Sequence, residues 1–300
     1  MKNAISMKSI SAAMVAGVLV LASCGKTTDV LNSGDVQNVN SEAVADSYTS
    51  ETSDMGNTVI SSVTNTKYGG GREAGSITGL EGIDGRLTGS TITLTADANS
   101  TKDSPSGVIT IDFKTGVTTN GVTRKGEIKI TYSGRKFVQG STRIISFINY
   151  ARNSVVFDNG MTYTITNASD STAGKITLHH VLTAGKLTFP GNTFITRNTD
   201  FNEAFDYVAK TLTLSASTAA YAATGTTRAG KDYKTKITAP IVYKADCIAA
   251  KVFIPVSGEK VVTAGLVDYA VNFGDGTCDN TVTITVLGKT ATITVNADGN

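Results

Sequence analysis

Residues 281–286 read Thr-Val-Thr-Ile-Thr-Val, so polar and apolar side chains alternate at every position. Successive side chains of a β-strand point to opposite faces, and this alternation buries one face while the threonines stay in contact with water. Similar runs occupy residues 91–95, 108–113 and 127–132, and they are rich in the β-branched residues that strands favour. The pattern predicts an all-β chain of antiparallel strands.

Short turn sequences separate several of these runs. Asp158-Asn159-Gly160 lies between residues 155–157 and 161–165, and Leu287-Gly288-Lys289 separates the last two runs. Asn-Gly indicates a tight hairpin because both residues tolerate positive φ. Consecutive hairpins predict an antiparallel meander, and the number of runs suits a two-sheet sandwich or a partly open barrel.

The composition is that of a globular chain with an apolar core. The 300 residues are 40% hydrophobic and 17% charged, with 30 Gly and 4 Pro, which excludes disordered and collagen-like proteins. The formal charge is only +2, so the chain lacks the overall excess of Lys and Arg that is typical of nucleic-acid-binding proteins. We therefore expect no nucleic-acid partner.

The N-terminus resembles an export signal. Lys2 and Lys8 precede an apolar run from Ile10 to Leu21, which at about a dozen residues is too short to span a bilayer. The run ends in Leu21-Ala22-Ser23-Cys24, which resembles the lipobox of bacterial lipoproteins. We expect residues 1–23 to be a lipoprotein signal peptide and Cys24 to carry the lipid; an ordinary secretory signal with an incidental cysteine is the alternative.

The segments that follow differ in composition. Residues 24–40 are mostly small and polar, which predicts a flexible tether. Residues 41–300 are expected to form a single β-rich domain, with a possible helix over residues 41–56 that Ser41 would cap. Because Lys2 and Lys8 are the only charges in residues 1–23, the rest of the chain is formally neutral.

Export would place the two remaining cysteines in an oxidising compartment. A disulfide between Cys247 and Cys278 is the economical interpretation, and a free catalytic thiol is the alternative.

Other polar groups have two interpretations each. Asp275, Asp279 and Asn280 surround Gly276, so they either bind a hard cation such as Ca²⁺ or form a turn, and the turn is favoured.

His179 and His180 are adjacent and would point to opposite faces of a strand, which disfavours a zinc site or a catalytic triad. We expect no resident metal and no cofactor.

Two further groups of residues were considered as binding surfaces. The aromatic group, which could stack on sugars but which we favour as core, is Tyr132, Phe147, Tyr150 and Tyr163. The basic group, which could bind phosphate or anionic lipid but which we favour as a solvated hairpin end, is Arg124, Lys125, Arg135 and Lys136.

Residues 40–300 resemble an uncharacterised family of lipoproteins from Bacteroidota-type bacteria. The most specific resemblance is the motif Phe273-Gly274-Asp275-Gly276-Thr277-Cys278-Asp279-Asn280, preceded by Ile111-Asp112-Phe113, Thr131-Tyr132-Ser133-Gly134 and Ile237-Thr238-Ala239-Pro240. The chain departs from the family near Lys114 and Val117, where Gly and Cys would be expected. The resemblance implies a β-rich outer-membrane or surface lipoprotein and supplies no established activity.

Together these features predict a lipid-anchored cell-envelope protein with a non-enzymatic binding or structural role. Its partners would be the outer membrane, through the lipid, and a glycan or another envelope protein. The alternative is a glycan-binding surface lipoprotein for polysaccharide capture, and a hydrolase is the third hypothesis, because two suitably placed carboxylates cannot be recognised from sequence.

Overall fold

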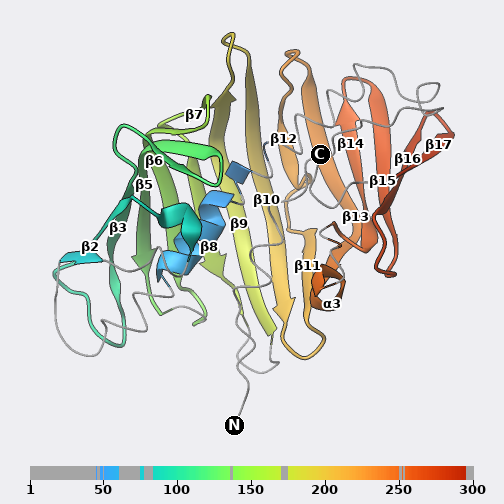
Figure 1. The fold of residues 1–300 in the computed structure, drawn as a ribbon. Coiled ribbons are helices and arrows are strands. Elements are labelled where there is room, and N and C mark those ends of the chain that lie inside the picture. The colour runs from blue at the N-terminus through green and yellow to red at the C-terminus, as the bar shows by residue number, and fades with distance from the viewer. Residues whose placement is uncertain are drawn as a thin grey trace. The chain divides into compact units, whose positions relative to one another are not determined.

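A computed structural model describes residues 45, 48–49, 51–60, 75–77, 84–135, 138–169, 175–249, 252 and 254–294 (Figure 1). The predicted signal peptide, Cys24 and the tether of residues 24–40 lie outside these ranges. None of the helices in the described residues combines the length and apolar character needed to cross a membrane.

The structure confirms the all-β class and the antiparallel meander. The chain divides into two compact units, which are Met1–Glu51 with Thr199–Asn300 (unit 1) and Thr52–Asn198 (unit 2). The boundary falls within β10 (Phe194–Asp206), and each unit is described by itself.

Unit 2 contains a short 3₁₀ helix, η3 (Gly85–Leu87), and one antiparallel sheet. Its strands are β1 (Gly75–Ile77), β2 (Thr91–Ala96), β3 (Ser106–Asp112), β4 (Val117–Thr119), β5 (Val122–Ser133), β6 (Thr142–Arg152), β7 (Val155–Phe157), β8 (Thr162–Asn167), β9 (Lys175–Thr188) and the start of β10. Each strand pairs with a strand close to it in sequence, so the sheet grows along the chain.

Two positions in this sheet are each filled by two strand segments. β3 and β4 both pair with β5, and β7 and β8 lie between the same two strands, β6 and β9. Asn159-Gly160 therefore interrupts one strand position, and the predicted hairpin at this site is wrong. The side chain of Asn159 instead accepts a 2.8 Å hydrogen bond from the Asn149 amide of β6, which fixes the interruption against its neighbour.

A helix packs on the buried face of the unit 2 sheet. Residues 51–60 are helical, so the helix extends past residue 56, where the predicted helix ends. Met55 and Val59 are completely buried. A Cβ added to Gly56 would lie 3.2 Å from Cδ1 of Ile130, so the absence of a side chain at Gly56 allows the helix to approach the sheet closely.

Unit 1 contains the rest of β10, further antiparallel strands of the same sheet and the five-residue helix α3 (Ala245–Ala249). Its strands are β11 (Thr211–Ala216), β12 (Ala223–Thr226), β13 (Asp232–Lys244), β14 (Ser257–Ala264), β15 (Val267–Asp275), β16 (Thr281–Val286) and β17 (Lys289–Thr294). The Leu287-Gly288 hairpin is confirmed, since Val286 pairs with Lys289 and both turn residues have positive φ.

The alternation that predicted the strands also builds the core of unit 1. Val282, Ile284 and Val286 are buried and their threonine neighbours are half-exposed. Across the sheet, Val286 is level with Tyr269, and Tyr269 is level with Val262. Rows of this kind form one cluster of buried side chains that also includes Cys247.

Gly126 provides a test of the register shift between β5 and β6, which falls between Lys125 and Glu127. Its φ is +75°, and an added Cβ would overlap the Asn149 carbonyl group of β6. We expect Gly126→Ala to lower the free energy of unfolding by about 2 kcal/mol or more, since left-handed strain and a backbone clash add. Urea unfolding measures this change.

Gly121→Ala is the matched control, because Gly121 has the same φ of +75° and no atom within 4 Å of the added Cβ. Its loss should be about 1 kcal/mol. Equal losses in the two variants would show that the close approach at Gly126 contributes nothing.

Candidate functional site

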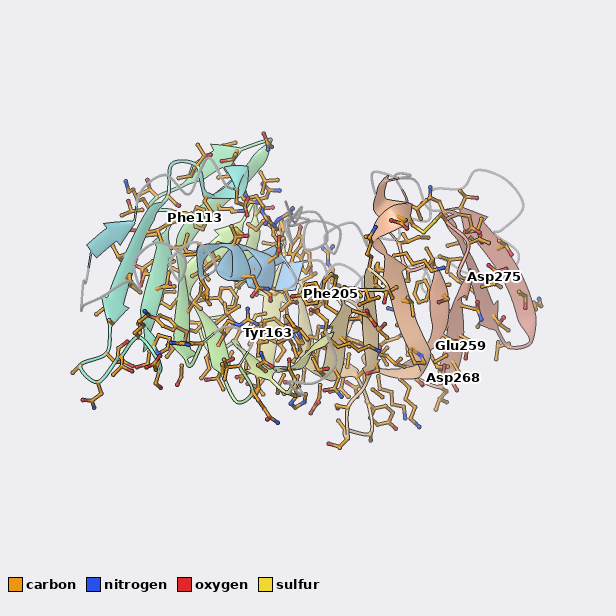
Figure 2. All side chains as sticks on the ribbon, turned by 90° about the horizontal axis from the view of Figure 1, so that it is seen from below. Phe113, Tyr163, Phe205, Glu259, Asp268 and Asp275 are labelled. Carbon is orange, nitrogen blue, oxygen red and sulfur yellow. A yellow bond between two sulfur atoms is a disulfide. The ribbon has the colours of Figure 1, made fainter. Side chains whose placement is uncertain are left out.

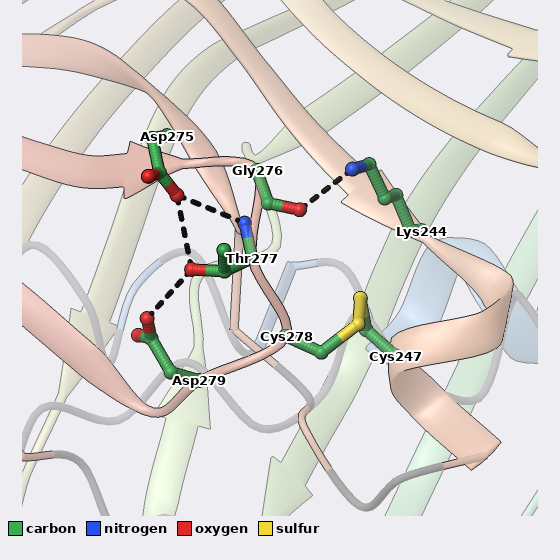
Figure 3. Close-up of a disulfide and its surroundings, with 7 residues drawn as sticks. All are labelled: Lys244, Cys247, Asp275, Gly276, Thr277, Cys278 and Asp279. Carbon is green, nitrogen blue, oxygen red and sulfur yellow. Dashed lines mark hydrogen bonds between the residues drawn. A yellow bond between two sulfur atoms is a disulfide. The ribbon is translucent and has the colours of Figure 1, made fainter.

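A disulfide joins the short helix α3 to a loop at one end of the unit 1 sheet (Figure 3). Cys247 lies in α3, directly after β13, and Cys278 lies in the loop between β15 and β16. The sulfur atoms are 1.97 Å apart and the Cα atoms 5.1 Å apart, which confirms the predicted pairing. Since both thiols are consumed, a free catalytic cysteine at either position is excluded in this oxidised state.

The same loop is held by a lysine of β13. The Nζ of Lys244 donates a 2.6 Å hydrogen bond to the carbonyl of Gly276 (Figure 3). A charged donor makes this bond stronger than a neutral one. The loop is therefore attached to the end of β13 by one covalent and one charge-assisted contact.

Asp275 and Asp279 form the walls of a tight polar turn in this loop. Both carboxylates lie 2.9 Å from the hydroxyl of Thr277, and Asp279 also accepts bonds from the amide and hydroxyl of Thr281. Hydrogen bonds from the Thr277 amide to Asp275, and from the Thr281 hydroxyl to Asp279, lower the pKa of each carboxyl. Asn280 follows at a half-buried position.

The carboxylate oxygens of Asp275 and Asp279 are therefore engaged with amide and hydroxyl groups of the turn itself. Within the part of the chain that the structure describes, no three His, Cys, Asp or Glu side chains gather closely enough to hold a metal ion.

The two histidines point to opposite faces of β9, as their adjacency predicts. His180 is buried and its Nδ1 lies 2.7 Å from the hydroxyl of Tyr163, which is labelled in Figure 2, while His179 is half-exposed. Burial, together with the smaller effects of the positive charge of Arg143 and the neighbouring His179, lowers the pKa of His180 to about 3. His180 is therefore neutral and structural at physiological pH.

A partly buried ion triplet connects the helix of residues 51–60 to η3. Nη2 of Arg86 lies 2.5 Å from Asp54 and 2.6 Å from Asp84. Asp84 also caps η3 by accepting a bond from the Arg86 amide. Burial raises the pKa of Asp84, but the hydrogen bond and charge of Arg86 outweigh that effect and leave the pKa lowered.

This triplet was not found from the sequence. Asp54 and Arg86 are 32 positions apart and neither belongs to a recognisable motif. Two carboxylates share one guanidinium, so the triplet holds the helix in place and keeps one net negative charge.

The aromatic group lies in the core, as the favoured interpretation had it. Tyr132, Phe147, Tyr150 and Tyr163 are each at most 4% exposed. Phe147 and Tyr150 stack with ring centroids 5.6 Å apart. These rings offer no platform for sugars, and the aromatic rings most exposed among the described residues are Phe194 and Tyr207 instead.

The basic group does not form one cluster. Arg124 is buried near the start of β5, whereas Arg135 follows the end of that strand and binds Asp103 and the Lys102 carbonyl. About nine residues of extended strand separate them by roughly 30 Å. Lys125 is exposed, and Lys136 lies outside the described residues.

The described residues thus define an antiparallel all-β protein with a disulfide-tethered loop and buried polar pairs that serve packing. No family model, curated protein or solved structure matches the chain. The resemblance to a lipoprotein family therefore remains a prediction from the sequence.

His180 should make the fold sensitive to acid. The unfolded chain protonates this histidine near pH 6.5, whereas the folded protein does so only near pH 3, so the unfolded state binds more protons in between. Stability should therefore fall as the pH drops below 6.5, by at most about 1.4 kcal/mol per pH unit.

Urea unfolding of the protein and of His180→Gln at several pH values measures the difference, with His179→Gln as the control. Parallel profiles for the protein and His180→Gln would contradict the assignment.

The disulfide should contribute about 3 kcal/mol, because it closes a loop of about 30 residues in the unfolded chain. We expect Cys247→Ser with Cys278→Ser to lose this amount in thermal or urea unfolding. A reductant should reproduce the loss in the parent protein and have no effect on the double variant. A parent protein that titrates with two free thiols would show that the bond does not form.

Proposed function

We propose that this chain is a lipid-anchored protein of the bacterial cell envelope, attached to the outer membrane through Cys24, with a non-enzymatic binding or structural role. Two independent features support an exported location. One is the charged and apolar N-terminal run that ends in Leu21-Ala22-Ser23-Cys24.

The other feature, and the structural observation that carries the proposal, is the disulfide between Cys247 and Cys278. Stable disulfides persist in oxidising compartments and are rare in the cytosol. Cys247 is 1% exposed, so the bond lies partly within the packed core and is a structural staple. A staple of this kind requires folding after export, which is what the N-terminal signal would provide.

A binding or structural role agrees with the chemistry of the polar residues that were singled out. His180 is held neutral by burial and bonded to Tyr163, and the carboxylates of Asp275 and Asp279 are occupied by their own turn. Asp54 and Asp84 are both paired with Arg86. Each of these groups stabilises the fold. We therefore look for function on the surfaces of the described residues and not in a reactive centre.

The glycan-binding alternative is weakened, because the four aromatic rings that could have stacked on sugars are buried. We therefore retain the broader proposal of an anchored envelope protein that binds a partner or supports a structure.

The N-terminus of the membrane-extracted protein tests the anchor. Mass spectrometry should find a first peptide that begins at Cys24 and carries a diacylglycerol, because lipobox processing modifies the cysteine before the signal is cut. Cys24→Ser should abolish the added mass and move the protein from the membrane to the soluble fraction. An unmodified chain that begins at another residue would overturn the proposed anchor and leave only export.

A further inference from the structure

Three turns of unit 1 lie at the same end of its sheet. They join β12 to β13 (residues 227–231), β14 to β15 (residues 265–266) and β16 to β17 (residues 287–288). The amide of Gly265 donates a 3.1 Å hydrogen bond to the carbonyl of Asp232, which follows the first turn, and Val286 is level with Tyr269 near the start of β15. We call this set of turns the leucine end.

Two leucines at this end are unusually exposed. Leu266 is 103% exposed and Leu287 is 82% exposed, although fully hydrated leucine is unfavourable. Leu287 also has a φ of +49°, a conformation that Asn or Gly adopts more readily in a hairpin turn. The turn geometry therefore does not explain leucine at this position.

Cations surround these leucines. Arg228 and Lys231 are exposed in the first turn, and Lys289 lies two residues after Leu287, directly after Gly288. Two exposed carboxylates, Asp232 and Asp268, lie at the same end. The cations outnumber the carboxylates by three to two, and two of the three are in the turns themselves.

Among the described residues, the opposite end of the sheet has the reverse balance. Asp268 and Asp275, both labelled in Figure 2, mark the two ends of β15. Around Asp275 lie the carboxylates of Asp206, Asp246 and Asp279, at the ends of β10, β13 and the β15–β16 loop, against the cations of Lys210 and Lys244. An anionic surface would therefore be attracted to the leucine end and not to the disulfide end.

From this arrangement we propose that the leucine end docks on the surface of an anionic lipid bilayer, with Leu266 and Leu287 in the acyl boundary and the adjacent cations at the phosphates. Two contributions favour peripheral membrane binding. Apolar side chains enter the lipid interface, and adjacent cations are attracted to anionic lipid. The inference rests on the proposed envelope location, and it adds a second, non-covalent contact to the anchor at Cys24.

A bilayer fits this end better than a protein partner. The leucines stand at turn tips, separated by strands, and do not form a continuous apolar patch of the kind that fills a protein pocket. Isolated tips can enter a fluid interface one at a time, and each buried leucine then contributes without a complementary surface.

The absence of tryptophan from the chain allows a direct test. Leu266→Trp and Leu287→Trp each place a single indole at the leucine end. Val208→Trp is the control, since Val208 is 88% exposed in the β10–β11 turn at the disulfide end. The full-length membrane-extracted protein is mixed with vesicles made of equal parts phosphatidylglycerol and phosphatidylcholine, and with vesicles of phosphatidylcholine alone.

We expect a blue shift of the emission, and quenching by brominated lipid, for Leu266→Trp and Leu287→Trp on the anionic vesicles. Val208→Trp should show neither change. Adding Lys231→Gln and Lys289→Gln to Leu266→Trp should reduce the response on anionic vesicles, because both cations act through lipid charge.

Unchanged emission from both leucine-end indoles would overturn the proposal, as would an equal response from Val208→Trp. A response that is the same on neutral vesicles and insensitive to the lysine changes would overturn the role of the cations. Failure of the anchor is distinguished from failure of this proposal. Mass spectrometry detects an N-terminus without lipid, whereas the indoles report insertion of the turns whether or not Cys24 carries lipid.

Discussion

The pairing of each antiparallel strand with a near neighbour in sequence, with one face buried, is the constraint on which both units depend. Backbone hydrogen bonds fix the register, and the register decides which side chains face the core. A slip of one residue in β16 would exchange Val282 and Ile284 for Thr281 and Thr283. The alternation along each strand therefore constrains its register as well as its own conformation.

This constraint explains why the strands could be predicted and some of their connections could not. The alternating runs at residues 91–95 and 281–286 became β2 and β16 because alternation is a local property. Asn159-Gly160 has the composition of a hairpin, but the neighbours of β7 and β8 are set by β6 and β9. Which strands adjoin a turn is decided by distant residues, so a dipeptide does not reveal it.

The polar sites show the same division. The pairing of Cys247 with Cys278 and the opposite directions of His179 and His180 followed from a count and from strand geometry. The contact of His180 with Tyr163 joins two strands, and that of Asp54 with Arg86 joins a helix to a distant 3₁₀ turn. Nor did the sequence show that Arg124 is buried, because arginine is normally exposed.

The position of the disulfide also decides what a protease can release. The segment between Cys247 and Cys278 contains all of β14 and β15. A single cut within that segment leaves both fragments covalently joined, whereas a cut before Cys247 or after Cys278 separates the chain at once. The central strands of unit 1 thus stay together after damage that would otherwise divide the protein, until the bond is reduced.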